Sequence, residues 1–121
     1  MRIFKYIDFH DWAEDESVSD ESLMRAIIEI EQGLFEANLG GNLYKKRIAR
    51  KGQGKSGGYR TLIALKHNDR AIFIYGFAKN DRENITDKER KIFQHLAQLY
   101  LNVSNNELKI LLNIGELIEV E

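Results

Sequence analysis

Two apolar runs separated by a short polar pair constrain the fold more than any other part of this sequence. The runs, Tyr59–His67 and Arg70–Lys79, have the length and the β-branched and aromatic content of strands. The pair between them, Asn68-Asp69, predicts a two-residue turn. The sequence therefore predicts an antiparallel hairpin near the middle of the chain.

The register of this hairpin determines which side chains share a face. With a two-residue turn, Arg60 lies opposite Phe77 and Leu62 lies opposite Tyr75. Arg60 and Lys79 then lie on the face that carries both aromatic rings, about 7–8 Å apart and within joint reach of one phosphate. Cations beside aromatic rings are typical of an RNA-binding surface, although burial of the rings under a helix is an alternative. The opposite face is expected to pack against helices and carries Tyr59, Ile63, Leu65, Ile72 and Ile74.

Helical and strand patterns elsewhere complete a single α+β domain over residues 1–121, a length sufficient for one core. Two capping-box patterns, Thr86 with Glu89 and Ser104 with Glu107, predict the starts of C-terminal helices. Ser19 is expected to cap an earlier helix whose apolar positions run from Leu23 to Leu34. The other predicted elements are strands at Met1–Ile7, Leu43–Arg50 and Glu116–Val120, and a short helix around Phe9–Ala13.

Basic residues are concentrated in the middle of the chain. Residues 42–82 contain 11 basic and 2 acidic side chains, whereas residues 1–41 contain 3 and 10. The stretch Lys45–Arg60 has seven cations, no acid and a glycine-rich second half. Such a segment is typical of a surface that binds a polyanion, in particular a nucleic acid. The alternative is an unevenly charged, solvated surface.

Several other classes of function have no support in the sequence. The chain has no cysteine, and His10, His67 and His95 lack metal-ligand spacing, so we expect neither a metal nor another cofactor. Gly54-Lys55-Ser56 resembles the end of a phosphate-binding P-loop, but Ala49 stands where the first glycine is needed and no helix is predicted to follow. The absence of a long apolar run predicts a cytoplasmic protein without membrane contacts.

Three motifs of this sequence resemble the RelE/ParE superfamily of bacterial type II toxins. They are GKSGGYRT at 54–61, IYGFAKN at 74–80 and GELIEV at 115–120, and they look most like the RelE/HigB branch. The resemblance implies a small RelE-like domain. In that fold an antiparallel sheet has N-terminal helices packed on one face, together with a C-terminal helix.

The resemblance also implies a function. Such toxins cleave messenger RNA, many of them only on the ribosome, and are blocked by a cognate antitoxin. In HigB-like pairs the antitoxin is often a helix-turn-helix, HigA-like protein, and operator DNA is bound only through the toxin–antitoxin complex. Two alternatives stay open: a ParE-like, non-enzymatic inhibitor of DNA gyrase, and an RNA-binding module without catalytic activity.

RNA cleavage without a metal needs several chemical groups, and residues of this chain could supply them. Attack of a 2′-hydroxyl on the adjacent phosphate needs a base, an acid and donors for the developing charge. Arg60 suits charge stabilisation, and Lys55 or Lys79 is expected to transfer a proton. Some toxins of the family that this chain resembles have a tyrosine or histidine near the C-terminus that contributes to cleavage. The tail Leu108–Glu121 has neither, so the resemblance assigns this role to Tyr75 or to another residue. The expected RNA contacts are Lys51, Arg50, Asn80, Arg82 and Lys46.

Overall fold

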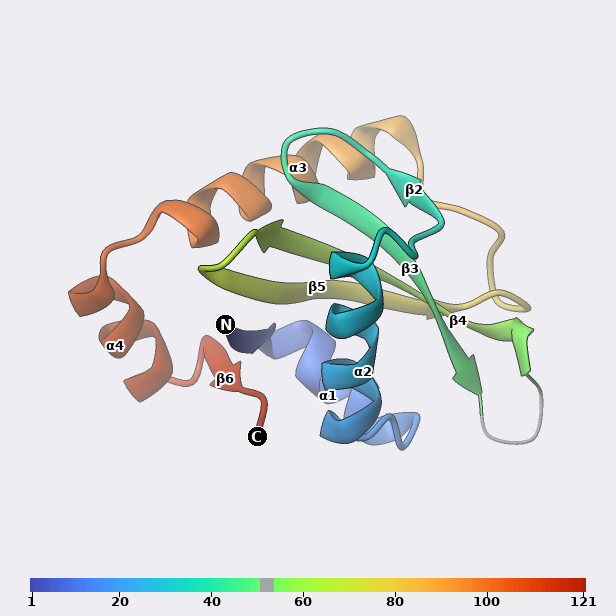
Figure 1. Cartoon of the computed structure of the whole chain (residues 1–121), viewed down its shortest axis with the longest axis horizontal. Helices are drawn as coiled ribbons and strands as arrows, with labels where there is room; N and C mark the ends of the chain where they lie inside the picture. Colours follow the sequence, from blue (N-terminus) through green and yellow to red (C-terminus); the bar gives the residue numbers. More distant parts are fainter. Residues whose placement is uncertain (51–53) are drawn as a thin grey trace.

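The computed structural model describes residues 1–50 and 54–121, without the side chains of residues 54–57. These residues form four helices and six strands, with two helices before and two after a run of four consecutive strands (Figure 1). In order they are β1 (Arg2–Tyr6), α1 (Ile7–Asp15), α2 (Asp20–Glu31), β2 (Ala37–Asn38), β3 (Leu43–Arg50), β4 (Gly54–Lys66), β5 (Arg70–Ala78), α3 (Asp87–Asn102), α4 (Asn105–Asn113) and β6 (Leu117–Glu119).

The strands form one sheet in the order β2-β3-β4-β5-β1-β6. Strands β2 to β5 form an antiparallel meander, and β6 pairs antiparallel with β1 at the opposite edge. β1 runs parallel to its neighbour β5. The α+β prediction is confirmed, and the sheet is mostly rather than wholly antiparallel.

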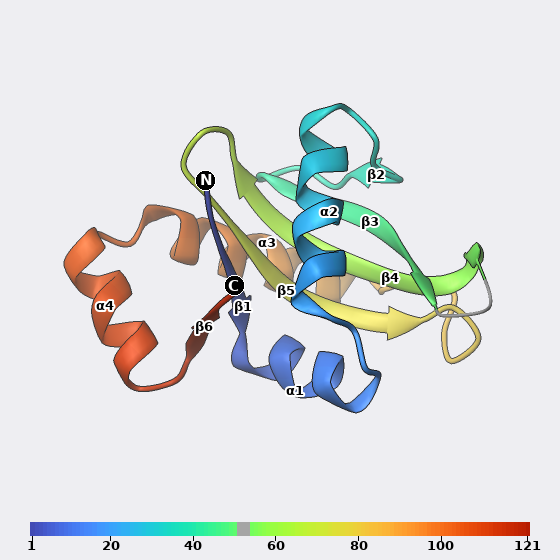
Figure 2. The ribbon, with the colours of Figure 1, turned by 60° about the horizontal axis from the view of Figure 1, so that its bottom comes forward.

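Helices cover both faces of this sheet, so there are two apolar clusters. Side chains of α1 and α2, among them Phe9, Leu23 and Ile27, pack on one face against Tyr59 and Phe73. The C-terminal helices α3 and α4 pack on the other face. Figures 1 and 2 show the N-terminal pair and the C-terminal pair on opposite sides of the strands, with the two termini close together.

The predicted helix starts are confirmed. The Ser19 hydroxyl accepts a hydrogen bond from the Ser22 backbone N–H at the start of α2. Thr86 and Ser104 each form a complete capping box, at the starts of α3 and α4. Helix α2 ends at Glu31, three residues before the predicted position Leu34, which is exposed.

The predicted hairpin is present, but its turn is one residue longer than expected. Lys66, not His67, pairs with Arg70, and Asn68 in the intervening loop has a left-handed φ of 60°. The pairing therefore starts in a different register, which puts Ile72 and Ile74 on the α3 face with Leu62 and Ala64. Their predicted placement on the opposite face is wrong.

A β-bulge restores the predicted pairing at the far end of the hairpin. The register shifts between Leu62 and Ile63, so that Leu62 lies opposite Tyr75 and Arg60 lies opposite Phe77. The extra residue, Ile74, points with Tyr75 toward the α3 side. The shared face predicted for Arg60, Tyr75 and Phe77 is therefore confirmed, although the turn that led to it is different.

Candidate functional site

Three cations on adjacent strands converge on the carboxylate of Glu36. Arg60 Nε lies 3.1 Å from Oε2, and Arg47 Nη2 donates to Oε1 at 3.2 Å. Lys45 Nζ lies 3.8 Å from Oε2. The Arg60 side chain is only 2 % exposed, whereas that of Arg47 is 46 % exposed. The cluster thus runs from the surface into the interior, on the face that α3 covers.

Lys46 points to the opposite face of the sheet. Its ammonium group lies 2.8 Å from a Glu29 carboxylate oxygen on α2 and donates to the backbone carbonyl of Leu34 at 2.8 Å. The side chain is 6 % exposed. Neighbouring residues of a strand point to opposite faces, so Lys45 and Lys46 lie on different faces of the sheet. The prediction that Lys46 contacts RNA does not fit its burial and its ion pair.

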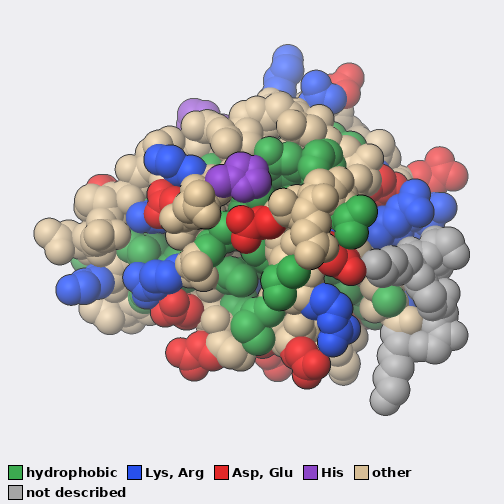
Figure 3. Space-filling view, in the orientation of Figure 1, with side chains coloured by type: hydrophobic (Ala, Val, Ile, Leu, Met, Phe, Trp, Pro, Cys, Tyr) green, Lys and Arg blue, Asp and Glu red, His purple; other side chains and the backbone are tan. Residues whose placement is uncertain are grey.

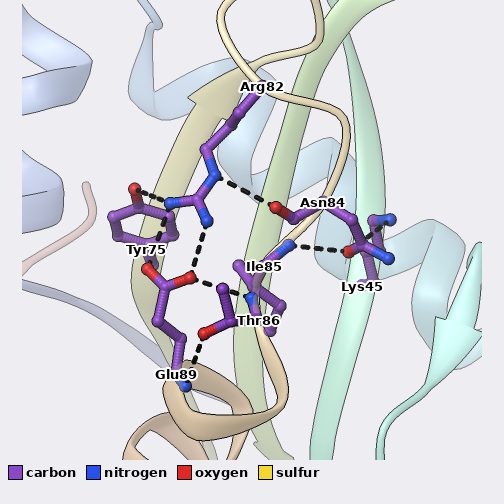
Figure 4. Close-up of polar contacts among 7 residues, drawn as sticks. All are labelled: Lys45, Tyr75, Arg82, Asn84, Ile85, Thr86 and Glu89. Atoms are coloured by element: carbon purple, nitrogen blue, oxygen red, sulfur yellow. Dashed lines mark hydrogen bonds and ion pairs between the residues drawn. The ribbon is translucent and has the colours of Figure 1, made fainter.

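A second polar network lies where β5 leads into α3. The Arg82 guanidinium donates to both carboxylate oxygens of Glu89, at 2.6 and 3.0 Å, and to the Tyr75 hydroxyl at 3.1 Å (Figure 4). These hydrogen bonds raise the pKa of Arg82, with Glu89 as the largest cause. The same bonds, assisted by the Thr86 backbone N–H, lower the pKa of Glu89 to about 2. Arg82 and Glu89 thus form a fixed bidentate ion pair.

Asn84 connects the two networks. Its side-chain oxygen accepts from Lys45 Nζ at 3.2 Å and from the Ile85 backbone N–H at 2.9 Å. Its backbone carbonyl accepts from Arg82 Nε at 3.1 Å. Polar contacts therefore run without a break from Glu36 through Lys45 and Asn84 to Arg82; Figure 4 shows the part from Lys45 to Arg82.

The two aromatic residues predicted for base stacking are largely enclosed by the protein. Tyr75 stacks on Phe93 of α3, with ring centroids 4.9 Å apart and planes 22° apart. Phe77 is 4 % exposed, and the Arg82 guanidinium lies 5.7 Å from its ring centroid. The ring of Tyr75 is therefore occupied by an intramolecular partner, while its hydroxyl belongs to the Arg82 network.

The remaining predicted residues lie around the same end of the sheet. Lys79 and Asn80 are exposed just beyond β5, and the Lys79 backbone N–H donates to the Gly58 carbonyl at 3.3 Å. Arg50, at the end of β3, lies over the ring of Tyr59 at 5.5 Å, and that ring packs in the α1–α2 cluster. Lys51 and the side chain of Lys55 lie outside the described residues. Figure 3 shows Lys and Arg side chains beside the residues drawn in grey, at this end of the molecule.

Of the cations in the two networks, the sequence predicted Arg60 and Arg82 but missed Lys45 and Arg47, and it also missed the acids and the amide. Glu36, Glu89 and Asn84 were not among the expected residues. The capping-box pattern identifies Glu89, because the side chain at its position in the box folds back to the start of the helix. Glu36 carries no such local signal, since it meets Arg60 only when β2 and β3 are aligned.

The fold and the cation-lined sheet define a class, the small RelE-like α+β domain. A family model described as the RelE toxin of the RelE/RelB toxin–antitoxin system matches residues 1–120. The chain therefore belongs to the RelE toxin family, within the RelE/ParE superfamily of type II toxins, and has a cognate antitoxin as its partner. A search of curated protein sequences gave no match.

In residues 1–50 and 54–121, no cluster of three or more His, Asp or Glu side chains could bind a metal ion. None of the helices in this part of the chain has the length and apolar character needed to cross a membrane.

Proposed function

We propose that this toxin is an endoribonuclease that inhibits translation by cleaving messenger RNA on the ribosome. The observation that carries the proposal is the convergence of Arg60, Arg47 and Lys45, from neighbouring strands, on one carboxylate. A built cluster of cations of this kind can bind a phosphodiester and stabilise charge that develops on it. Membership of the RelE toxin family supports the same activity.

In the proposed reaction the ribose 2′-oxygen attacks the adjacent phosphorus, and the bond to the 5′-oxygen of the next nucleotide breaks. The 2′-hydroxyl proton passes to a base, and the leaving oxygen takes a proton from an acid. Arg60 stabilises the negative charge of the transition state, which its planar fork suits. Lys79, exposed at the end of β5, transfers a proton, and Lys55 is the other candidate for this role.

Tyr75 is proposed to assist from the edge of the site. Its hydroxyl oxygen accepts a hydrogen bond from Arg82, which orients the group and leaves its own hydrogen for an acceptor. Arg82 is bound to Glu89 on one side and Asn84 on the other, so we assign it a positioning role in addition to the predicted RNA contact. The proposed surface contacts are Lys51, Arg50 and Asn80.

The overall charge supports action on the ribosome rather than on free RNA. The chain has a formal net charge of −1, and four cations of its basic stretch are paired with Glu29 or Glu36. Electrostatic attraction to free RNA is therefore weak, and translating ribosomes in the cytoplasm would supply the substrate in position. We propose a helix-turn-helix, HigA-like antitoxin as the inhibitor, with operator DNA bound only through the complex.

The test is induction of the toxin without its antitoxin, followed by primer extension on cellular messenger RNA. We expect growth arrest and new 5′ ends within translated codons. Lys79→Ala should reduce cleavage at least tenfold, because it removes the group proposed to transfer a proton. The side chain is exposed, so its loss should leave the fold intact. Lys66→Ala is the matched control, since Lys66 is an exposed cation at the opposite end of the same hairpin.

Two results would overturn the proposal. Arrest of DNA synthesis before protein synthesis, without messenger RNA cleavage, would favour a ParE-like inhibitor of DNA gyrase. Salt-sensitive RNA binding with neither cleavage nor toxicity would favour a non-catalytic RNA-binding module.

A further inference from the structure

Glu36 occupies the position that the charges around it would give to a phosphate. Each of its two carboxylate oxygens lies within 3.2 Å of an arginine nitrogen, and an ammonium group lies 3.8 Å away. Carboxylate and phosphate oxygens are interchangeable partners for the arginine fork. The cluster therefore has the donor set of an anion-binding site, and the anion is a side chain of the protein itself.

The cations of this cluster are held independently of Glu36. Arg47 and Arg60 lie directly opposite each other in the pairing of β3 with β4. Lys45, two residues earlier on β3, also donates to the Asn84 side chain. Strand pairing therefore keeps the three residues adjacent when the carboxylate moves away, and Asn84 also holds the Lys45 ammonium group.

Glu36 itself is held to β3 by its backbone N–H, which donates to the Lys45 carbonyl at 2.8 Å, so that its displacement would involve the side chain alone. It lies in the segment between the end of α2 at Glu31 and the start of β2 at Ala37, in which residues 32–36 are all exposed. Its side chain borders a surface hollow of about 360 Å³, whose lining also includes Phe35 and Arg47. A rotation of this side chain therefore opens the cluster toward solvent.

The Glu29–Lys46 pair on the opposite face provides a contrast. Glu29 is part of helix α2, and Lys46 also donates to the Leu34 carbonyl. Around Glu36, three cations meet one carboxylate, and the excess positive charge favours binding of a further or a stronger anion.

We propose that Glu36 occupies, in the free protein, a binding site for an RNA backbone phosphate formed by Arg60, Arg47 and Lys45, and that RNA binds by displacing this carboxylate. The identity of the ligand rests on the proposed function. The buried Arg60 then keeps an anionic partner in both states, Glu36 before binding and the phosphate afterwards, and never becomes an uncompensated buried charge.

The experiment measures phosphate binding and RNA binding separately. Inorganic phosphate is titrated into the wild-type protein and Glu36→Gln while thermal unfolding is followed. We expect phosphate to raise the melting temperature of Glu36→Gln and to leave that of the wild type nearly unchanged. A 2′-O-methyl RNA, which cannot be cleaved through its own 2′-oxygen, should bind Glu36→Gln roughly tenfold more tightly, the equivalent of about 1.4 kcal/mol.

Two further variants serve as a control and as a conservative substitution. Glu29→Gln removes the carboxylate from the opposite face and should gain neither phosphate nor RNA affinity. Glu36→Asp, whose carboxylate is one methylene shorter, should show a smaller gain in the same direction and replaces Glu36→Gln if the latter does not fold.

An unchanged phosphate response of both Glu36 variants would overturn this inference and leave the carboxylate as a structural partner of Arg60. Messenger RNA cleavage by the wild type would still support the proposed function in that case. Phosphate binding by Glu36→Gln without tighter RNA binding would overturn the assignment of RNA as the ligand of this site.

Discussion

Arg82 and Glu89 are joined by two hydrogen bonds, Nη2 to Oε1 at 2.6 Å and Nη1 to Oε2 at 3.0 Å. The pair ties the segment that follows β5 to the first turn of α3. Because the same guanidinium donates to the Tyr75 hydroxyl and to the Asn84 carbonyl, it also ties this segment to the sheet. The position of α3 over the candidate site therefore depends on this ion pair.

The pair predicts a specific loss of stability in acid. Hydrogen bonds from Arg82 lower the pKa of Glu89 from 4.5 to about 2, so the folded state favours the ionised carboxylate. The resulting stabilisation is fully present above the unfolded pKa and is lost as the pH falls from 4.5 to about 2. Thermal unfolding of the wild type and Glu89→Gln should therefore differ most near neutral pH and converge in acid.

Glu89→Gln is a suitable comparison because glutamine also serves at the third position of a capping box. The Thr86 backbone N–H, which now donates to Glu89, keeps an acceptor in the variant. A difference in melting temperature that stayed constant down to pH values near the pKa of Glu89 would show that the ion pair does not stabilise the fold.

Gly76 is required by its contact with Trp12. It lies on β5, and a Cβ atom at this position would overlap the Trp12 ring, which itself packs against Phe9 and Tyr59. Gly76→Ala should lower the free energy of unfolding by about 1–3 kcal/mol, the usual cost of overpacking. Denaturant unfolding measures this change.

A double-mutant cycle separates this steric cause from a general effect of alanine on the strand. Trp12→Leu alone should destabilise the core, but Gly76→Ala should cost much less when Trp12 is already leucine. Additive costs would show that the ring is not what excludes a side chain at position 76.

Local sequence signals predicted the elements of this fold well, because each signal acts within a few residues. Ser19, Thr86 and Ser104 cap the helices that they were expected to cap. The turn after Lys66 was less predictable, because Asn68 adopts a left-handed φ that also allows a three-residue loop. The β-bulge between Leu62 and Ile63 then restores the predicted pairing of the two strands. No turn motif predicts such a shift of register.

The residues of the candidate site were predicted only in part, because their ion-pair partners are distant in the sequence. A run of cations is visible in any sequence, but the carboxylates that neutralise its members are not adjacent to it. Glu36 precedes Arg60 by 24 positions and contacts it at 3.1 Å, whereas Lys46 turns to the other face and meets Glu29. Whether a basic residue is a surface charge or half of a buried ion pair depends on tertiary contacts.

Lys5, which is buried, forms an ion pair with the partly exposed Asp20, and this pair predicts an asymmetric response to mutation. Lys5 is 5 % exposed and its ammonium group lies 2.9 Å from Asp20 Oδ1, while Oδ2 accepts from the Glu121 backbone N–H. Burial raises the pKa of Asp20, but the hydrogen bonds from Glu121 and Lys5 outweigh it, so that the pKa is lowered. The Asp20 carboxylate is thus ionised in the folded state.

Asp20→Asn should therefore destabilise the protein by about 3–5 kcal/mol, because it leaves the Lys5 charge buried without its counterion. Lys5→Met, which removes that charge and keeps most of the side-chain volume, should cost clearly less. Denaturant midpoints of the two variants give the comparison. Equal losses would indicate that the volume of the Lys5 side chain, and not the pairing of its charge, determines stability here.

Lys46 and Lys79 predict opposite outcomes for one chemical change, replacement of lysine by methionine. Lys46 is buried against Glu29, so Lys46→Met should change the free energy of unfolding and leave the salt dependence of RNA binding as it was. Lys79 is exposed beside the proposed site, so Lys79→Met should leave stability unchanged and weaken binding.

Loss of one phosphate contact should lower the slope of log K against log salt by about 0.7 for a single strand. Titration of 2′-O-methyl RNA at several salt concentrations measures both variants, with exposed Lys66→Met as the control for charge alone. If Lys46→Met rather than Lys79→Met lowered the slope, the RNA surface would have to be moved to the α2 face of the sheet.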